Sequence, residues 1–217
     1  MNDQFSGFTL SEQLEQRKQQ GAAKAPTEVI ALRQAETDKL IASGIAERSL
    51  HQGDLAPDFT LPDAEGKSVT LSTLLREGPV VVSFYRGSWC PYCNLQLRAY
   101  QAVLPEIIHA GATLVAISPQ TPEAAMEIVD KASLKFPVLS DVGNQVARAY
   151  RLVFVLPEAL RPYTANLPQY NASDSWELPM PGTFVVGQDG IIRLAFVHAD
   201  YTKRLEPSDI LTALRQA

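Results

Sequence analysis

The feature that most constrains the fold of this chain is the segment Trp89-Cys90-Pro91-Tyr92-Cys93, which gathers both cysteines of the sequence into one C-x-x-C unit. An apolar run rich in β-branched residues, 80–85, precedes this unit, and a helical pattern follows it. The unit is therefore expected where a buried strand ends and a helix begins. A C-x-x-C pair in this position predicts thiol redox chemistry.

The position of the pair predicts different roles for the two thiols. Proline is favoured at the first position of a helix, so Pro91 makes Cys90 the expected N-cap residue and places Cys93 in the first turn. At an N-cap, unpaired N–H groups and the positive end of the helix dipole favour a thiolate. Residues three apart share a helix face, so Cys93 can attack a sulfenic acid or mixed disulfide on Cys90. We predict Cys90 as the nucleophile and Cys93 as the resolving thiol.

Two other interpretations of the pair are half of a zinc site and two inert core thiols. A structural zinc site needs four ligands, whereas the chain has no second C-x-x-C, and its three histidines (His51, His109 and His198) lack ligand spacing. Inert core cysteines commonly occur singly, not as a pair between a strand and a helix. The sequence therefore predicts no metal and no cofactor.

The composition indicates an enzyme of the cytoplasm. The formal net charge is −5 and no cluster of Lys and Arg is present, which argues against nucleic acid or an anionic membrane as a partner. The segment 1–5 lacks the basic and apolar regions of a signal peptide, and no stretch approaches the roughly 20 apolar residues of a membrane span. Cysteines limited to one C-x-x-C fit a reducing compartment.

The first 50 residues differ from the rest and predict a helical extension, followed by one domain over residues 51–217. Thr9-Leu10-Ser11-Glu12 matches a capping box, and Pro26-Thr27-Glu28 can open a second helix that ends near Ser43. The apolar stripe of this second helix is too narrow to separate two alternatives. The extension either packs on its own domain or is an arm exchanged within a homodimer.

Predicted strands and helices alternate through the second region and indicate the α/β class. Strands are expected at 58–61, 68–71, 80–85, 113–117, 137–139, 183–186 and 191–197, and helices after the cysteines with a break at Pro105, at 121–132, from Asp141 to Tyr150 and from Pro207. Strands linked by helices predict a central, mostly parallel sheet with an antiparallel hairpin at one side and helices on its faces.

Three segments carry a family resemblance: 56–63 (APDFTLPD), 84–93 (FYRGSWCPYC) and 180–190 (MPGTFVVGQDG). They resemble the peroxiredoxin-like branch of the alkyl-hydroperoxide-reductase and thiol-specific-antioxidant (AhpC/TSA) family, which has the thioredoxin fold. The resemblance covers about residues 50 to 217. It implies a thioredoxin-like domain with a central mixed sheet flanked by helices.

The chain departs from the family's pattern around the cysteines. Peroxiredoxins usually carry Pro-x-x-x-Thr/Ser-x-x-Cys and an Arg on a later strand, which together polarise the peroxide. Counting back from Cys90 puts Gly87 at the hydroxyl position, and counting back from Cys93 puts Cys90 there. Pro181 stands where the strand arginine is expected, and it resembles the cis-proline that thioredoxins place opposite their cysteines. We therefore expect a cis Met180–Pro181 bond that faces both sulfurs.

Two further residues and one segment are candidate parts of the site. Arg86 could bring a guanidinium to the thiolate or to a peroxide, or it could simply face solvent. Trp89 resembles the tryptophan before the first cysteine of thioredoxins, with local packing as the alternative. The proline-containing segment 151–179 is long enough for a functional lid, although an ordered surface excursion explains it equally well.

Two enzymatic functions and one non-enzymatic function remain open at this stage. The resemblance favours a thiol peroxidase in which Cys90 attacks a hydroperoxide, Cys93 closes a disulfide, and a thioredoxin-like or glutathione-dependent donor re-reduces the pair. The alternative is a disulfide reductase that uses the same dithiol. The third is a redox-sensing interaction protein in which the helical extension or the 151–179 segment moves.

Overall fold

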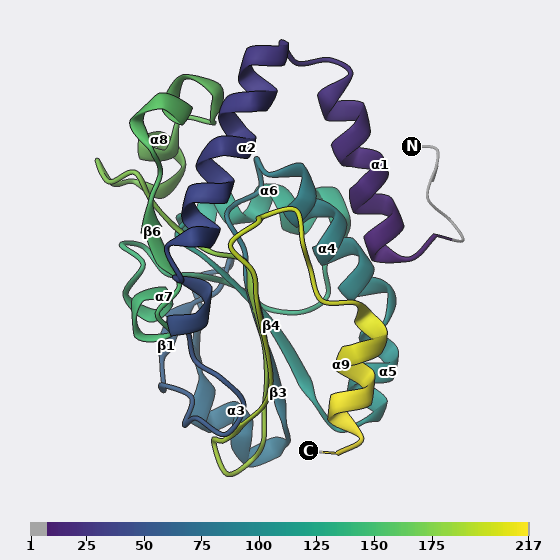
Figure 1. The fold of residues 1–217 in the computed structure, drawn as a ribbon. Coiled ribbons are helices and arrows are strands. Elements are labelled where there is room, and N and C mark those ends of the chain that lie inside the picture. Colours follow the sequence, from purple (N-terminus) through teal and green to yellow (C-terminus); the bar gives the residue numbers. More distant parts are fainter. Residues whose placement is uncertain (1–7, 217) are drawn as a thin grey trace.

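A five-stranded mixed sheet forms the centre of the computed structural model, which describes residues 8–216 (Figure 1). Its strand order is β5-β4-β3-β8-β9. Strands β3 (Val80–Phe84), β4 (Thr113–Ser118) and β5 (Val138–Ser140) are parallel, whereas β8 (Gly182–Val186) and β9 (Ile192–Val197) form an antiparallel hairpin next to β3. The predicted α/β fold with a mixed central sheet is confirmed.

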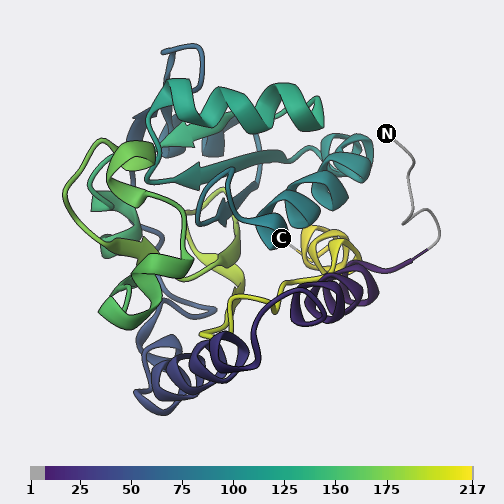
Figure 2. The same ribbon diagram turned by 90° about the horizontal axis from the view of Figure 1, so that it is seen from above.

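Side chains of the central strand β3 alternate between the two faces of the sheet, as the two-residue period of a strand requires. Val80, Val82 and Phe84 belong to one core cluster, and Val81 and the following Tyr85 belong to the other. The first cluster is covered by α3 (Leu71–Glu77) and α7 (Gln145–Ala149), and the second by α4 (Pro91–Ala102), α5 (Leu104–His109), α6 (Pro122–Ala132) and α9 (Pro207–Leu214). Figure 2 shows the helices on both sides of the sheet.

The expected breaks and caps of the helices are present. Pro105 follows the first residue of α5, and the long helical pattern after the cysteines is divided between α4 and α5 at Val103. Thr121 caps α6, since its hydroxyl accepts a hydrogen bond from the Ala124 N–H. Short-range sequence signals were sufficient here because the proline and the cap act within one turn.

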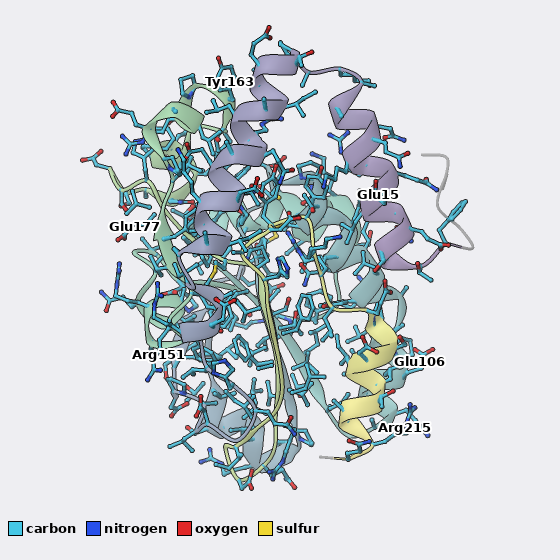
Figure 3. All side chains as sticks on the ribbon, viewed as in Figure 1. Glu15, Glu106, Arg151, Tyr163, Glu177 and Arg215 are labelled. Atoms are coloured by element: carbon cyan, nitrogen blue, oxygen red, sulfur yellow. The ribbon has the colours of Figure 1, made fainter. Side chains whose placement is uncertain are left out.

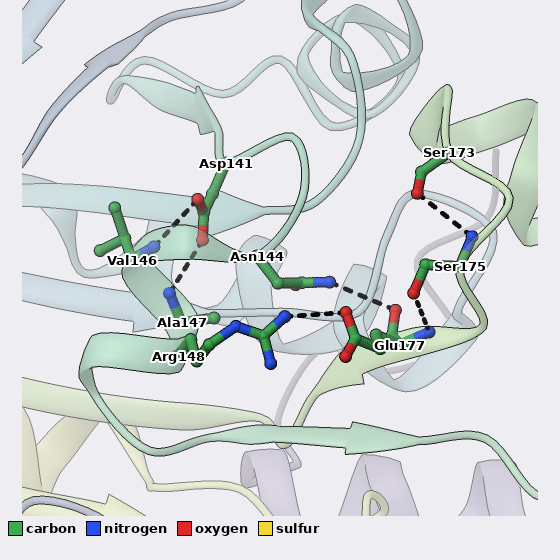
Figure 4. Close-up of polar contacts among 8 residues, drawn as sticks. All are labelled: Asp141, Asn144, Val146, Ala147, Arg148, Ser173, Ser175 and Glu177. Carbon is green, nitrogen blue, oxygen red and sulfur yellow. Dashed lines mark hydrogen bonds and ion pairs between the residues drawn. The ribbon is translucent and has the colours of Figure 1, made fainter.

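The carboxylate of Asp141 caps α7, although the N-cap residue is Asn144 (Figure 4). Asp141 accepts hydrogen bonds from the Val146 and Ala147 N–H groups at 3.1 and 2.8 Å. The helix begins later than predicted, at Gln145, because a turn separates Asp141 from the first helical residue.

The segment 151–179 is an ordered excursion with elements that the sequence did not predict. Strands β6 (Val153–Val155) and β7 (Glu177–Pro179) pair antiparallel, with η2 (Glu158–Tyr163) and α8 (Leu167–Asn171) between them. Arg148 of α7 forms an ion pair of 2.8 Å with Glu177, and the Asn144 amide donates to the Glu177 carbonyl (Figure 4). The base of this hairpin is therefore fixed to the domain.

The first described residues form a helical hairpin of α1 (Leu10–Ala22) and α2 (Thr27–Ala42), followed by η1 (Ala46–Arg48). The predicted capping box is present: the Thr9 N–H donates to the Glu12 carboxylate at 2.7 Å, and the Glu12 N–H donates to the Thr9 hydroxyl at 3.2 Å. Leu10 and Leu14 are buried in the core cluster that contains both cysteines. The extension thus packs on its own chain, while the domain boundary at residue 50 stays a prediction.

The smaller elements complete the domain. The strands expected at 58–61 and 68–71 correspond to β1 (Thr60–Pro62) and β2 (Ser68–Thr70), which pair antiparallel. Helix α3 follows β2 directly and was not predicted from the sequence. Within residues 8–216, no helix is both long enough and apolar enough to cross a membrane.

Candidate active site

Cys90 is the N-cap residue of α4 with Pro91 at the first helical position, as predicted. Both thiols are free and buried, with exposed fractions of 1% for Cys90 and 0% for Cys93. Cys90 lines a cavity of about 270 Å³, whereas Cys93 does not. A small molecule that enters this cavity therefore meets Cys90 and not Cys93.

The loop that precedes Cys90 is held in one conformation. Gly87 has φ +145°, and a Cβ atom there would lie 2.3 Å from the Trp89 indole nitrogen, so only glycine fits. The Ser88 N–H donates to the Gln120 side-chain oxygen at 2.6 Å, and the Asn94 amide donates to the Ser88 carbonyl at 2.9 Å. These contacts fix the approach of the chain to Cys90.

The groups that stabilise a thiolate converge on Cys93 rather than on Cys90. The Arg86 N–H donates to the Cys93 sulfur at 3.4 Å, and an Arg204 Nη2 donates to it at 3.5 Å. Burial raises the pKa of Cys93, but a hydrogen bond from the Cys90 thiol, the Arg204 guanidinium and Arg86 outweigh it and lower that pKa to about 5. Burial and the adjacent Cys93 raise the pKa of Cys90.

Arg204 is held at this position by a buried polar network. Its Nε donates to the Gln96 side-chain oxygen at 2.7 Å, and its Nη1 donates to the carbonyls of Tyr201 and Lys203. The Gln96 amide nitrogen in turn lies within hydrogen-bonding distance of three hydroxyls, those of Ser83, Tyr100 and Thr183. Since Gln96 follows Cys93 by three residues on α4, one helix face positions both the sulfur and the guanidinium.

Arg204 forms no ion pair with a carboxylate among residues 8–216, although it is only 6% exposed. A buried guanidinium without a counter-charge is costly. A thiolate on Cys93 supplies that counter-charge at 3.5 Å. The charge balance therefore favours the deprotonated form of Cys93.

Arg86 is buried beside the dithiol, which decides between the two alternatives that the sequence left open for its position. It is 6% exposed, and its guanidinium lies over the rings of Trp89 and Tyr201, at 5.0 and 4.4 Å from their centroids. Its Nε atom has no hydrogen-bond partner within the described chain. Trp89 is half-buried and lines the cavity beside Cys90.

The expected cis bond before Pro181 is wrong: Met180–Pro181 is trans. Pro181 is buried at the start of β8 and lines a second cavity of about 220 Å³, which Arg86 and Tyr201 also line and neither cysteine does. The residue is thus a strand-entry proline, and most X–Pro bonds are trans. The structure therefore does not support the resemblance of Pro181 to the cis-proline of thioredoxins.

Sequence reasoning missed four residues of the site region: Arg17, Arg33, Gln96 and Arg204. Arg204 is 111 residues from Cys93 along the chain, so no local spacing joins them. Arg17 on α1 and Arg33 on α2 line the Cys90 cavity only because the helical hairpin folds over it. Gln96 gave a signal that could have been used, since it is a polar residue on the buried face of a predicted helix.

The fold and the site together define a class of protein, the thioredoxin-fold proteins with a C-x-x-C pair after the central strand. The cysteines lie at the start of the helix that follows the central strand, and a hairpin of two antiparallel strands completes the sheet. The chain belongs to the AhpC/TSA family, which matches residues 52–195. This membership confirms the resemblance seen in the sequence.

Relatives within this family are similar to the chain over part of its length. A putative peroxiredoxin of Mycobacterium tuberculosis is 40% identical over 101 residues, which are 46% of this chain and 64% of the relative. The chloroplastic peroxiredoxin Q of Sedum lineare is 32% identical over 146 residues, 67% of this chain and 68% of the relative. The chain thus spans somewhat less than two thirds of the mycobacterial relative that it matches.

Solved structures are similar in fold. The peroxidoxin BcpB of Mycobacterium tuberculosis superposes with a TM-score of 0.62 and 24% identity, over 77% of this chain and 97% of that one. The bacterioferritin comigratory protein of Xanthomonas campestris gives a TM-score of 0.56 and 20% identity, over 73% of this chain and 90% of that one. These matches confirm the thioredoxin-like fold.

Proposed function

We propose that this chain is a thiol peroxidase that reduces hydrogen peroxide or organic hydroperoxides through Cys90 and Cys93. Membership of the AhpC/TSA family and relatives named peroxiredoxins support the reaction class. The observation that carries the proposal is the charge at the dithiol: two buried guanidiniums, those of Arg86 and Arg204, lie beside the thiols and pair with no carboxylate among residues 8–216.

In the first step the Cys90 sulfur attacks the peroxide, because Cys90 lines the cavity and Cys93 does not. The Cys90 proton moves to the Cys93 thiolate along the hydrogen bond between the two thiols. The O–O bond breaks, the terminal oxygen becomes the sulfenic acid of Cys90, and the leaving alkoxide or hydroxide takes the proton from Cys93. Cys93 is then a thiolate again, and the peroxide has been reduced to an alcohol or water.

In the second step the Cys93 thiolate attacks the Cys90 sulfenic sulfur. An S–S bond forms, hydroxide leaves and takes up a proton from solvent, and the pair becomes a disulfide. The low pKa of Cys93 keeps it deprotonated at neutral pH, so no separate base is needed for this step.

The arginines replace the polarising groups that the sequence lacks. Negative charge develops on the leaving oxygen, and Arg86 lines the cavity next to Cys90 and forms no ion pair among residues 8–216. Arg204 acts on Cys93, whose sulfur it contacts. Arg86 is thus the group proposed to contact the peroxide, and Trp89 with Tyr201 holds its guanidinium in place.

The disulfide-reductase alternative fits the same dithiol less well. A protein disulfide has to bring its sulfur to Cys90, which is 1% exposed and lines a cavity between the helical hairpin and residues 156–165. A redox sensor would require the helical hairpin or the 151–179 segment to move, but both are anchored, by Glu206 and by Arg148 respectively. Neither observation favours these functions over a peroxidase.

The reductant class, the compartment and the assembly are also proposals. A thioredoxin-like or a glutathione-dependent donor would return the disulfide to the dithiol. A dithiol cycle of this kind fits the cytoplasm, where thiols are kept reduced. A homodimer stays a prediction, which a measurement of molar mass in solution tests.

The peroxidase proposal is tested by mixing the reduced protein with hydrogen peroxide in a stopped-flow instrument and following Trp fluorescence. We expect one disulfide and loss of two free thiols per peroxide consumed. The same protein is mixed with oxidised glutathione and with insulin. Rapid reduction of insulin disulfides, with no reaction with hydrogen peroxide or an alkyl hydroperoxide, would overturn the proposal in favour of a disulfide reductase.

A further inference from the structure

We propose that the cavity above Cys90 binds a small thiol that carries carboxylate groups, and that this thiol reduces the Cys90–Cys93 disulfide. The inference rests on the proposed function and selects between the two classes of reductant that it leaves open. It comes from the charge, the walls and the size of the cavity.

The cavity is lined by three arginines from three separate parts of the chain. Arg17 comes from α1, Arg33 from α2, and Arg86 from the loop before Cys90. No Asp or Glu is among the lining residues, although the whole chain has a net charge of −5. This excess of positive charge is therefore local and marks an anion-binding surface.

The arginines are not neutralised by the protein. None of the three forms an ion pair within residues 8–216, and the one hydrogen bond of the Arg33 side chain is to the Tyr163 carbonyl at 3.2 Å. Two buried donors in the lining residues, Arg86 Nε and Trp89 Nε1, lack partners in the described part of the chain. Both atoms are shielded from solvent, so the binding of an anion here depends on Arg17 and Arg33, which are partly exposed and line the cavity.

The walls of the cavity favour a small molecule over a protein dithiol. The helical hairpin supplies one wall with Arg17 and Arg33, and residues 156–165 supply another. Tyr163, which belongs to the second wall, lies beside α2 (Figure 3), and its carbonyl accepts a hydrogen bond from Arg33 of that helix. A folded reductant presents its cysteine on its own surface and requires an exposed disulfide, whereas Cys90 is 1% exposed. The cavity volume of about 270 Å³ is close to the lower limit, about 300 Å³, of sites that bind small molecules.

The chemistry at the two sulfurs suits attack from this cavity. The thiolate of the small molecule attacks the Cys90 sulfur, the S–S bond breaks, and Cys93 leaves as a thiolate. A leaving thiol with a low pKa departs faster, and the Arg204 guanidinium and the Arg86 N–H, which contact the Cys93 sulfur, both lower the pKa of Cys93. A second small thiol then attacks the mixed disulfide on Cys90, releases the oxidised small molecule, and restores the Cys90 thiol.

The test measures reduction of the isolated disulfide form of the full chain, prepared with one equivalent of hydrogen peroxide. The probes are glutathione, glutathione ethyl ester, the uncharged 2-mercaptoethanol and a thioredoxin, and the signals are Trp fluorescence and free-thiol titration. We expect glutathione to react with a saturable rate and at least about tenfold faster than its ester at low concentration, because a charge-assisted contact is lost in the ester.

The variants are Arg17→Gln, Arg33→Gln and Arg33→Lys, with Arg98→Gln as a charge-matched control. Arg98 is exposed on α4 and does not line the cavity. We expect each Gln variant to lower the second-order rate constant with glutathione by roughly tenfold and that with the uncharged 2-mercaptoethanol by much less. Arg33→Lys keeps the positive charge and should retain most of the rate constant with glutathione. This variant separates the effect of the charge from the effect of losing the hydrogen bond from Arg33 to the Tyr163 carbonyl.

Three outcomes would overturn the inference. The first is faster reduction by thioredoxin than by glutathione at equal concentration. The second is equal rates with glutathione and its ester. The third is an effect of the variants on oxidation by a carboxylate-bearing hydroperoxide but not on reduction, which would assign the arginines to the peroxide. Failure of the proposed function is distinguishable, since the disulfide would then not form with any peroxide.

Discussion

The two thiols of this site differ in both access and acidity, and the two properties belong to different residues. Cys90 lines the cavity, while Cys93 accepts the hydrogen bonds from Arg86 and Arg204 that lower its pKa. The N-cap position of Cys90 was expected to make Cys90 the thiolate. In the structure the Arg204 guanidinium and the Arg86 N–H contact Cys93 instead and lower its pKa. The N-cap position does not lower the pKa of Cys90, which burial and Cys93 raise.

Substitution of each cysteine tests this division of roles. We expect Cys90→Ser to abolish peroxide turnover, because the sulfur that meets the peroxide is lost. Cys93→Ser should still form a sulfenic acid on Cys90, although slowly, because the base and the resolving thiol are both removed. A dimedone-type reagent and mass spectrometry identify the sulfenic acid. A sulfenic acid trapped on Cys93 in the Cys90→Ser protein would reverse the assignment.

Arg204 is expected to set the pH range of the reaction. The rate of peroxide attack on the wild type should rise as pH increases through about 5, where Cys93 loses its proton, and stay level near pH 7. Arg204→Gln removes a positive charge and therefore raises the pKa of Cys93. The rise of the rate with pH should then occur at higher pH, so that activity lost at pH 6 returns near pH 9.

The control for this prediction is Arg204→Lys, which keeps the charge but not the hydrogen bond from Nε to Gln96. In Arg204→Lys the rate of peroxide attack should rise over a pH range closer to that of the wild type. A uniform loss of rate at all pH values in Arg204→Gln would indicate a structural role for the arginine and contradict the prediction.

At the scale of elements, the N-terminal helix α1 is part of the core and not a free arm. Leu10 and Leu14 are 2% and 4% exposed, and the N–H groups of Leu10 and Ser11 donate to the carboxylate of Glu206 at the start of α9. The carboxylate at the helix N-terminus is favourable for both hydrogen bonding and the helix dipole. These contacts hold Arg17 over the cavity.

We expect Leu14→Ala to destabilise the protein by about 2–5 kcal/mol, because it removes a buried side chain and leaves a cavity. The measurement is urea unfolding of the reduced protein, with Leu55→Ala as the control, since Leu55 is 67% exposed. The change should also weaken glutathione-dependent reduction through the displacement of Arg17. An effect of Leu14→Ala no larger than that of Leu55→Ala would show that α1 does not contribute to the core.

The elements differ in how well the sequence predicted them. Strand β3, the break at Pro105 and the cap at Thr121 were predicted because their signals act within a few residues. The hairpin of β6 and β7 was missed because its three-residue strands, 153–155 and 177–179, lie 21 residues apart and carry no clear alternation. Their contacts with the rest of the domain, such as the ion pair between Glu177 and Arg148 of α7, join residues that are distant in the sequence.

At the scale of the whole molecule, the reduced dithiol should couple stability to pH. The pKa of Cys93 is about 5 in the folded protein and near its ordinary value of 9.0 when unfolded. Between these values the unfolded chain binds more protons than the folded one, so the free energy of unfolding rises with pH, and this stabilisation is lost as pH falls through about 5.

The measurement is urea unfolding of the reduced wild type and of reduced Cys93→Ser at several pH values from about 6 to about 8. The wild type should gain up to about 1.4 kcal/mol per pH unit relative to the variant. Parallel pH dependences of the two proteins would contradict a thiolate on Cys93 in the folded state.

The sequence by itself determined the α/β class, the mixed sheet, the place of the dithiol at the start of α4 and the kind of chemistry. These follow from periodicity, proline positions and the spacing of the two cysteines, which are local properties of the chain. Only the tertiary structure decided that Met180–Pro181 is trans, that Cys93 is the more acidic thiol and that Arg17 and Arg33 line the cavity. The reason is physical: a pKa and a binding surface depend on which charges meet in space, and Arg204 reaches Cys93 across 111 residues of chain.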